Sequence, residues 1–123
     1  MIRILVVDDY ADFRLVCVLM LQRQPELEVV GQAGSLAEAR TMLEGVDVVL
    51  LDRGLPDGDG LELIGPLREV NPHARVLVMS TTVEMSHPAD AIEAGAEGVI
   101  DKMAPFEQMS AAIRGDGRGQ AAF

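Results

Sequence analysis

Residues 2–9 of the chain, IRILVVDD, decide the fold, because a continuous β-rich apolar run ends there in two adjacent carboxylates. Similar apolar runs occupy Val46–Leu51 and Val76–Met79, and weaker ones occupy Leu27–Val30 and Gly98–Ile100. A short run without polar alternation is typical of a strand that is buried on both faces, as in parallel sheets. The pattern therefore predicts a parallel sheet built from these strands.

Helical patterns alternate with these apolar runs along the chain. We expect helices over roughly Ala11–Gln24, Leu36–Leu43, Leu61–Val70, Ala89–Ala94 and Phe106–Arg114. Pro66 should kink the third of these helices or delay its start, and Pro88 should keep the fourth one short. The alternation predicts an α/β fold, and 123 residues leave no room for a second domain.

The composition excludes several classes of protein. Twenty acidic and ten basic side chains give a formal net charge of −10, which argues against direct binding of nucleic acid. Cys17 is the only cysteine, so a disulfide within the chain and a Cys-based zinc site are excluded. The apolar runs are shorter than the roughly 18 residues of a membrane span, and the first residues lack the layout of a signal peptide. We therefore expect a cytoplasmic protein without a membrane partner.

Polar residues of complementary types follow four of the predicted strands. These residues are Asp8 and Asp9, Asp52, Ser80 and Thr81, and Asp101 and Lys102. Ligands of open parallel sheets bind beyond the carboxyl ends of the strands, where these side chains should converge. Carboxylates suit a hard cation such as Mg²⁺, and a carboxylate can itself be phosphorylated, with hydroxyl and ammonium groups binding the phosphoryl oxygens. The residues alone thus predict a Mg²⁺-dependent aspartyl-phosphate site.

Four blocks of sequence point to a known family. They are residues 4–9 (ILVVDD), 50–60 (LLDRGLPDGDG), 76–80 (VLVMS) and 94–102 (AGAEGVIDK). In their order and spacing, the chain resembles the receiver domain of bacterial two-component response regulators. The residues VVG at 29–31 and the AGA block are most similar to receivers that usually precede a helix-turn-helix output domain, which does not follow here. The resemblance implies a receiver domain over residues 1–114, followed by a Gly-rich tail over 115–123 that we expect to be disordered.

The resemblance also implies a fold and a role for individual residues. The fold would be flavodoxin-like and doubly wound, with helices on both faces of a five-stranded parallel sheet in the order 2-1-3-4-5. Asp52 would be the phosphoacceptor, and Ser80 and Lys102 would contact the phosphoryl group. Mg²⁺ or Mn²⁺ would be held by Asp8, Asp9, Asp52 and the backbone carbonyl of Gly54. The protein would then be a switch in a phosphorelay rather than an enzyme with turnover.

The chain departs from the family's usual pattern at three positions. Val99 stands where most receivers have an aromatic residue that changes rotamer on activation. Arg53 follows Asp52, and we expect it to pair with a nearby acid or to alter access to the site. Met103 follows Lys102, so the Lys–Pro peptide of many receivers is missing.

Two surfaces are expected to bind partners. On the first helix, Leu15, Val18 and Leu19 should form an exposed apolar patch that docks a histidine kinase or a histidine phosphotransfer protein. In the family, the fourth helix, fifth strand and fifth helix present the output face to a downstream protein or to a second copy of the chain. Because Val99 is not aromatic, the signal is expected to travel through Ser80 and the loop at 81–87.

Other functions remain open at this point. A pseudo-receiver would keep the fold and act as a phosphorylation-independent interaction module, although the full set of acidic, hydroxyl and ammonium residues speaks against it. A flavodoxin-type cofactor binder would need a Gly/Ser/Thr-rich phosphate loop after the first strand. Asp8 and Asp9 stand there instead and would repel a cofactor phosphate. A nucleotide-binding P-loop pattern is absent from the sequence.

Overall fold

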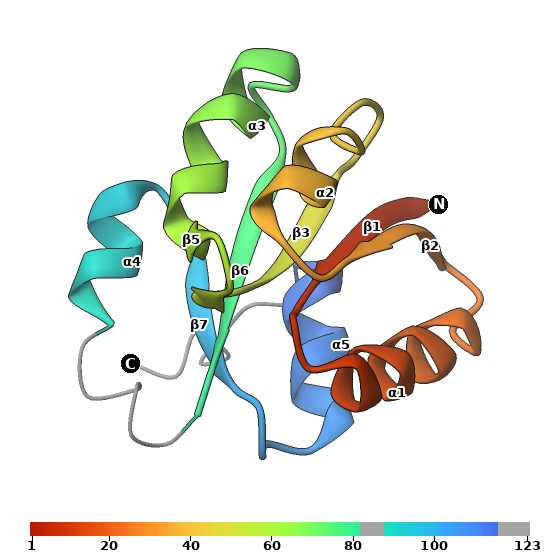
Figure 1. The fold of residues 1–123 in the computed structure, drawn as a ribbon. Coiled ribbons are helices and arrows are strands. Elements are labelled where there is room, and N and C mark those ends of the chain that lie inside the picture. The colour runs from red at the N-terminus through yellow and green to blue at the C-terminus, as the bar shows by residue number, and fades with distance from the viewer. Residues whose placement is uncertain (82–87, 116–123) are drawn as a thin grey trace.

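A computed structural model describes residues 1–81 and 88–115, and its centre is a five-stranded parallel sheet (Figure 1). Its strands, in chain order, are β1 (Ile2–Val7), β2 (Leu27–Ala33), β3 (Val48–Asp52), β6 (Arg75–Ser80) and β7 (Gly98–Asp101). Their spatial order is β2-β1-β3-β6-β7, and each neighbouring pair is parallel. Counted along the chain, this is the order 2-1-3-4-5, so the predicted flavodoxin-like fold is confirmed.

Helices cover both faces of the sheet. They are α1 (Ala11–Gln22), α2 (Leu36–Arg40), α3 (Ile64–Val70), α4 (Ala89–Ala94) and α5 (Phe106–Arg114). Alternate strand residues point to opposite faces, so Leu5 packs in the core below α2, α3 and α4, whereas Ile4 packs in the core below α1 and α5. Figure 1 shows α1 and α5 together on one side of the sheet. The two aliphatic cores hold the strand ends in fixed positions.

The observed elements follow the predicted ones closely, with one region that the sequence analysis missed. After β3 the chain forms a small hairpin of β4 (Gly54–Leu55) and β5 (Gly58–Asp59), and then a 3-10 helix over Gly60–Leu63. The helix α3 begins only at Ile64, so Pro66 lies in its first turn, where the missing N–H costs no helical hydrogen bond. The delayed start expected from Pro66 is therefore confirmed, and α4 is short as expected from Pro88.

One prediction for the first helix is wrong. Val18 is buried, because the stripe of α1 that packs on the sheet runs through Cys17, Val18 and Leu21. The large apolar residues that α1 exposes are instead Leu15, Val16, Leu19 and Met20, whose exposed fractions are 50%, 51%, 50% and 36%. We call these four residues the outer apolar face of α1.

The far end of the sheet is tied to α5 by one arginine. The guanidinium of Arg75, the first residue of β6, donates to both carboxylate oxygens of Glu97 at 2.6 and 2.8 Å. It also donates to the carbonyl oxygens of Ala112 and Ile113, at 2.6 and 2.7 Å, in the last turn of α5. The Ala112 carbonyl also accepts from the N–H of Gly115 at 3.1 Å, so Arg75 and Gly115 together cap the C-terminus of α5.

Two predictions fall partly outside the described residues. The loop expected to carry the signal includes residues 82–87, and the expected tail includes residues 116–123. Within residues 1–81 and 88–115, no helix is both long enough and apolar enough to cross a membrane.

Candidate functional site

Three carboxylates meet at the carboxyl edge of the sheet. Asp8 and Asp9 directly follow β1, and Asp52 ends the neighbouring strand β3. One carboxylate oxygen of each lies within 4.8 Å of the others. Asp8 is fully buried and Asp52 is 5% exposed, while Asp9 is open to solvent. Parallel pairing of β1 with β3 thus brings together residues that are more than forty positions apart in the sequence.

A single ammonium group lies between the two buried carboxylates. Lys102, which follows β7, places Nζ 2.8 Å from Asp8 Oδ2 and 3.3 Å from Asp52 Oδ2. The same Nζ lies 5.1 Å from the centroid of the Phe13 ring on α1, which is a cation–π distance. The Lys102 side chain is only 14% exposed. Lys102 is therefore held by two carboxylates and one ring, a contact with α1 that the sequence analysis did not anticipate.

Ser80 is the last residue of β6, at the carboxyl edge of the sheet where Asp52 ends β3. It is buried at 3% exposure and is aligned with Asp101 of β7 in the sheet register. Its carbonyl oxygen accepts a hydrogen bond of 2.8 Å from the backbone N–H of Lys102. The hydroxyl-bearing residue and the lysine are thus joined through their backbones.

The segment after Asp52 forms a hairpin that packs against the backbone at the end of β3. The backbone N–H of Gly54 donates to Asp52 Oδ1 at 3.2 Å. Arg53 pairs with Asp59 at 2.9 Å, which confirms the expectation that it finds a nearby acid. Asp57 accepts from the N–H groups of Leu36 and Ala37, at 2.8 and 3.0 Å, and so caps α2. The turn aspartates at 57 and 59 therefore have structural partners outside the carboxylate cluster.

Burial and charge shift the ionisation of the central groups. Burial, followed by the neighbouring charge of Asp8, raises the pKa of Asp52 from 3.8 to about 6 despite the opposing effect of Lys102. Burial alone would lower the pKa of Lys102, but its contacts with Asp8 and Asp52 outweigh burial and raise it. The site thus holds two buried carboxylates and one exposed carboxylate against one ammonium, which leaves it electronegative at neutral pH.

The donor set fits a hard divalent cation. Asp8 Oδ2 is fully buried and, among the described residues, accepts no well-aligned hydrogen bond, although the Lys102 ammonium lies close to it. The three cluster residues all offer oxygen, which Mg²⁺ and Mn²⁺ prefer. Burial raises the pKa of the nearby Cys17 thiol to about 11, so this group stays protonated and is a poor ligand. The residues present are therefore suited to Mg²⁺ rather than to zinc.

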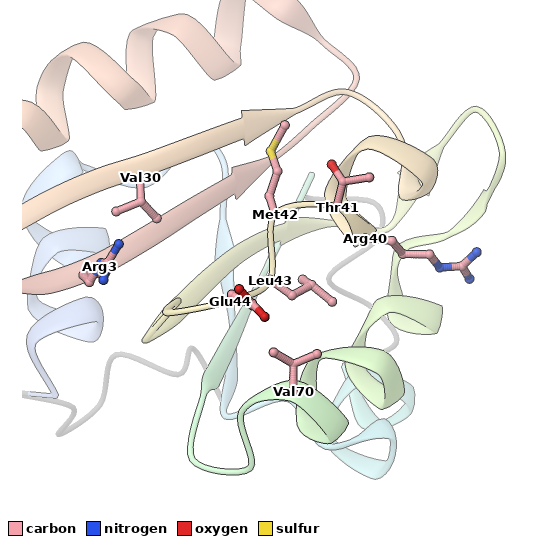
Figure 2. Close-up of a pocket in the computed structure, with 8 residues that line it drawn as sticks. All are labelled: Arg3, Val30, Arg40, Thr41, Met42, Leu43, Glu44 and Val70. Atoms are coloured by element: carbon pink, nitrogen blue, oxygen red, sulfur yellow. The ribbon is translucent and has the colours of Figure 1, made fainter.

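A pocket elsewhere on the molecule has different chemistry. A pocket of about 500 Å³ lies between the first half of β1, the segment after α2 and the end of α3. Figure 2 shows the residues that line it. Its lining residues include Arg3, Met42, Glu44 and Val70, and the Arg40 side chain extends away from the others. Arg3 lies near the start of β1, whereas Asp8 follows its end. The pocket therefore shares no residue with the carboxylate cluster.

Comparison with known proteins places this geometry in a family. A model of the response regulator receiver domain matches residues 4–114. The chain is 37% identical over 123 residues to the DNA-binding transcriptional activator DevR/DosR of Mycobacterium tuberculosis, a match that covers 98% of this chain and 57% of that protein. The chain spans 30% to 59% of the length of curated relatives that it matches.

Solved structures share the fold. The signal receiver domain of the response regulator NarL from Mycobacterium tuberculosis has a TM-score of 0.84 at 30% identity, and the match covers 95% of this chain and 98% of that one. A response regulator from Burkholderia pseudomallei, solved with a phosphorylated aspartic acid, a calcium ion and citrate, has a TM-score of 0.77 at 25% identity. That match covers 98% of this chain and 69% of the other.

Proposed function

The chain belongs to the response regulator receiver domain family, and on that basis we propose that it is the phosphoacceptor switch of a two-component phosphorelay. Asp52 accepts a phosphoryl group from a histidine kinase or a histidine phosphotransfer protein in the cytoplasm. The phosphorylated form changes the contacts that the domain makes with other proteins. The receiver unit comprises residues 1–114, and the only reactions it catalyses are its own phosphorylation and dephosphorylation.

The observation that carries this proposal is the buried carboxylate pair with its shared lysine. Asp8 and Asp52 are both buried, and Lys102 Nζ lies within 3.3 Å of each. A structural domain would gain little from two buried like charges, because their desolvation opposes folding. A phosphotransfer site needs this arrangement, since one carboxylate must react while the other helps to hold a cation. The phosphorylated aspartic acid and calcium ion of the similar Burkholderia pseudomallei protein support the same chemistry here.

Asp52 acts as the nucleophile in this reaction. A carboxylate oxygen of Asp52 forms a bond to phosphorus while the bond from phosphorus to the donor nitrogen breaks, and the donor keeps that electron pair. Hydrolysis later returns the carboxylate and inorganic phosphate. A Mg²⁺ ion bound by Asp8, Asp9, Asp52 and the Gly54 carbonyl would offset the negative charge of the incoming phosphoryl group.

Lys102 and Ser80 bind the transferred group. When Asp52 carries the phosphoryl group, the Lys102 ammonium is close enough to exchange its contact with the carboxylate for a charge-assisted hydrogen bond to a phosphoryl oxygen. Ser80 supplies a hydroxyl donor from the adjoining strand end. Because Ser80 and Lys102 share a backbone hydrogen bond, a movement of one is transmitted to the other.

The phosphodonor docks on the outer apolar face of α1, which replaces the expected patch that included Val18. Beside this face lies an apolar hollow of about 200 Å³ between α1 and α5, lined in part by Phe13, Val16, Met20 and Lys102. The exposed apolar side chains of α1 lead from solvent to this hollow, next to the reacting groups. A helix of the donor that buried this face would therefore approach Asp52 closely.

The output face comprises α4, β7 and α5, and it contacts a downstream protein or a second copy of the chain. Val99 of β7 is buried at 1% exposure in the core that also contains Ala91 of α4. A buried, β-branched side chain cannot swing between the interior and the surface as an aromatic ring can. The output therefore depends on backbone shifts near Ser80 rather than on a rotamer change at residue 99.

Labelling with a small phosphodonor tests this function. The purified chain is incubated with acetyl phosphate and Mg²⁺, and intact mass spectrometry is expected to show a gain of one phosphoryl group. Asp52→Asn should abolish the gain and Asp57→Asn should preserve it, because Asp57 caps α2 outside the cluster. A pseudo-receiver would show no gain, and full labelling in excess chelator would contradict the metal requirement.

A further inference from the structure

The hairpin after Asp52 lies directly on the backbone of the candidate phosphoacceptor. In this hairpin Gly54 is paired with Asp59, and Leu55 with Gly58. A Cβ atom built on Gly60, the next residue, would overlap the backbone oxygen of Asp52. Only glycine allows an approach this close, so the hairpin is seated against the end of β3.

The pairing in the hairpin orients the backbone of Gly54. The N–H of Gly60 donates to the carbonyl of Arg53 at 2.8 Å, which makes Gly54 and Asp59 a non-hydrogen-bonded pair of the antiparallel ladder. In such a pair, the N–H and C=O of each residue point away from the partner strand. The N–H of Gly54 accordingly reaches Asp52 Oδ1, so the carbonyl of Gly54 is turned toward the carboxylate side as well.

One ion pair links the two sides of the hairpin beside the Gly54–Asp59 pair. Arg53 Nη2 lies 2.9 Å from Asp59 Oδ2, and the two side chains are 25% and 43% exposed. Asp59 is anchored in turn to the 3-10 helix: its Oδ1 accepts from the N–H of Leu61 at 3.0 Å, and its own N–H donates to Glu62 Oε2 at 3.1 Å. The pair thus joins the residue before Gly54 to the residue opposite Gly54.

We propose that the Arg53–Asp59 ion pair is a positioning device for the metal site, which holds the Gly54 backbone so that its carbonyl stays directed at the cation bound by Asp8, Asp9 and Asp52. This inference rests on the proposed function. The two-residue strands of the hairpin make few backbone hydrogen bonds, so a side-chain closure is needed to restrict their motion. Arg53 and Asp59 are positioning residues, since they act through Gly54.

The test measures metal affinity directly. Isothermal titration with Mg²⁺, and binding of Mn²⁺ followed by electron paramagnetic resonance, are compared for the wild-type chain and for Asp59→Asn. Asparagine keeps the side-chain oxygen that caps the 3-10 helix and removes only the charge that pairs with Arg53. We expect affinity to fall about tenfold, the usual size of an effect from a residue that orients a ligand.

Two further variants make the result specific. Asp57→Asn removes the same charge from the same hairpin but from a residue that does not pair with Arg53, and it should leave the affinity unchanged. Arg53→Gln should lower the Mg²⁺ affinity as Asp59→Asn does. The double variant should bind Mg²⁺ as tightly as the single variant with the lower affinity, because the two residues act as one unit. Arg53→Gln also provides the test if Asp59→Asn fails to fold.

The outcomes separate this inference from the function on which it rests. Unchanged affinity in folded Asp59→Asn or Arg53→Gln, an equal loss in Asp57→Asn, or additive losses in the double variant would overturn the positioning role, while phosphorylation of the wild type would stand. Failure of the wild type to bind Mg²⁺ or to accept phosphate would overturn the proposed function itself, together with this inference.

Discussion

Replacing the candidate phosphoacceptor should stabilise the protein at neutral pH, and the size of the effect follows from its burial. Asp52 has a pKa of about 6 in the folded chain against an ordinary value of 3.8, because burial and the charge of Asp8 disfavour the ionised form. A difference of about 2 in pKa corresponds to about 3 kcal/mol, at about 1.4 kcal/mol per pH unit. Asp52→Asn removes this charge and should raise the free energy of unfolding by up to that amount.

The gain should depend on pH in a defined direction. A carboxyl whose pKa is raised by folding binds its proton more tightly in the folded state, so the wild type loses stability as pH rises from about 4 to about 6. Near pH 4 the wild-type Asp52 is protonated and resembles asparagine, so the two proteins should differ little there. Above pH 6 the full difference should be present. Mg²⁺ should reduce it, because the cation binds and stabilises the wild type.

Urea titrations in chelator at several pH values between 4 and 7.5 measure this effect. Asp57→Asn is the matched control, and its effect on stability should have the opposite sign. The N–H groups of Leu36 and Ala37 lower the pKa of Asp57, so the charge of Asp57 stabilises the folded state above that pKa. It should destabilise at pH 7.5, and the loss should fade as pH falls. If Asp52→Asn were no more stable than the wild type at pH 7.5, or gained as much at pH 4, the electrostatic account of the site would be refuted.

Arg75→Ala should lower the free energy of unfolding by about 2 kcal/mol, because it removes charged hydrogen bonds to Glu97 and to the end of α5; an unchanged thermal midpoint would contradict this. Gly60→Ala should lower the free energy of unfolding by about 1–3 kcal/mol, because its Cβ would overlap the backbone oxygen of Asp52. A Cβ on Gly54 meets no atom within 4 Å, so Gly54→Ala should leave the stability unchanged. Equal urea midpoints for the two variants would refute the close approach of Gly60 to Asp52. Leu19→Glu should slow phosphotransfer from a histidine kinase about tenfold and spare labelling by acetyl phosphate, while equal losses with both donors would rule out docking at this face.

Much of the fold could be predicted because its signals are local. The strand β1 is apolar on both faces, and its predicted bounds, Ile2–Val7, are those observed. The same holds for α5, whose pattern spans Phe106–Arg114. Once the strands are known to be parallel, the meeting of Asp8 with Asp52 follows, because parallel strands present their carboxyl ends at one edge.

The contacts that the sequence could not predict depend on tertiary packing. A helical wheel orders the residues of α1 around its axis but does not say which side faces the sheet, so the pattern alone places Val18 on the wrong side. Asp57 and Asp59 both indicate a turn beside glycine. Asp57 caps α2, 20 residues away in the sequence, whereas Asp59 pairs with Arg53. No feature of the local sequence distinguishes these two roles.

Tyr10 gives this molecule an optical property that follows from its place beside the acidic edge. Its backbone N–H donates to Asp8 Oδ1 at 2.8 Å, and the residue as a whole is 64% exposed. The chain has no tryptophan and no second tyrosine, so ultraviolet emission excited at tyrosine wavelengths comes from this one residue. A change in this emission on addition of Mg²⁺ or acetyl phosphate to the unlabelled protein would therefore arise within two residues of the buried carboxylate of Asp8.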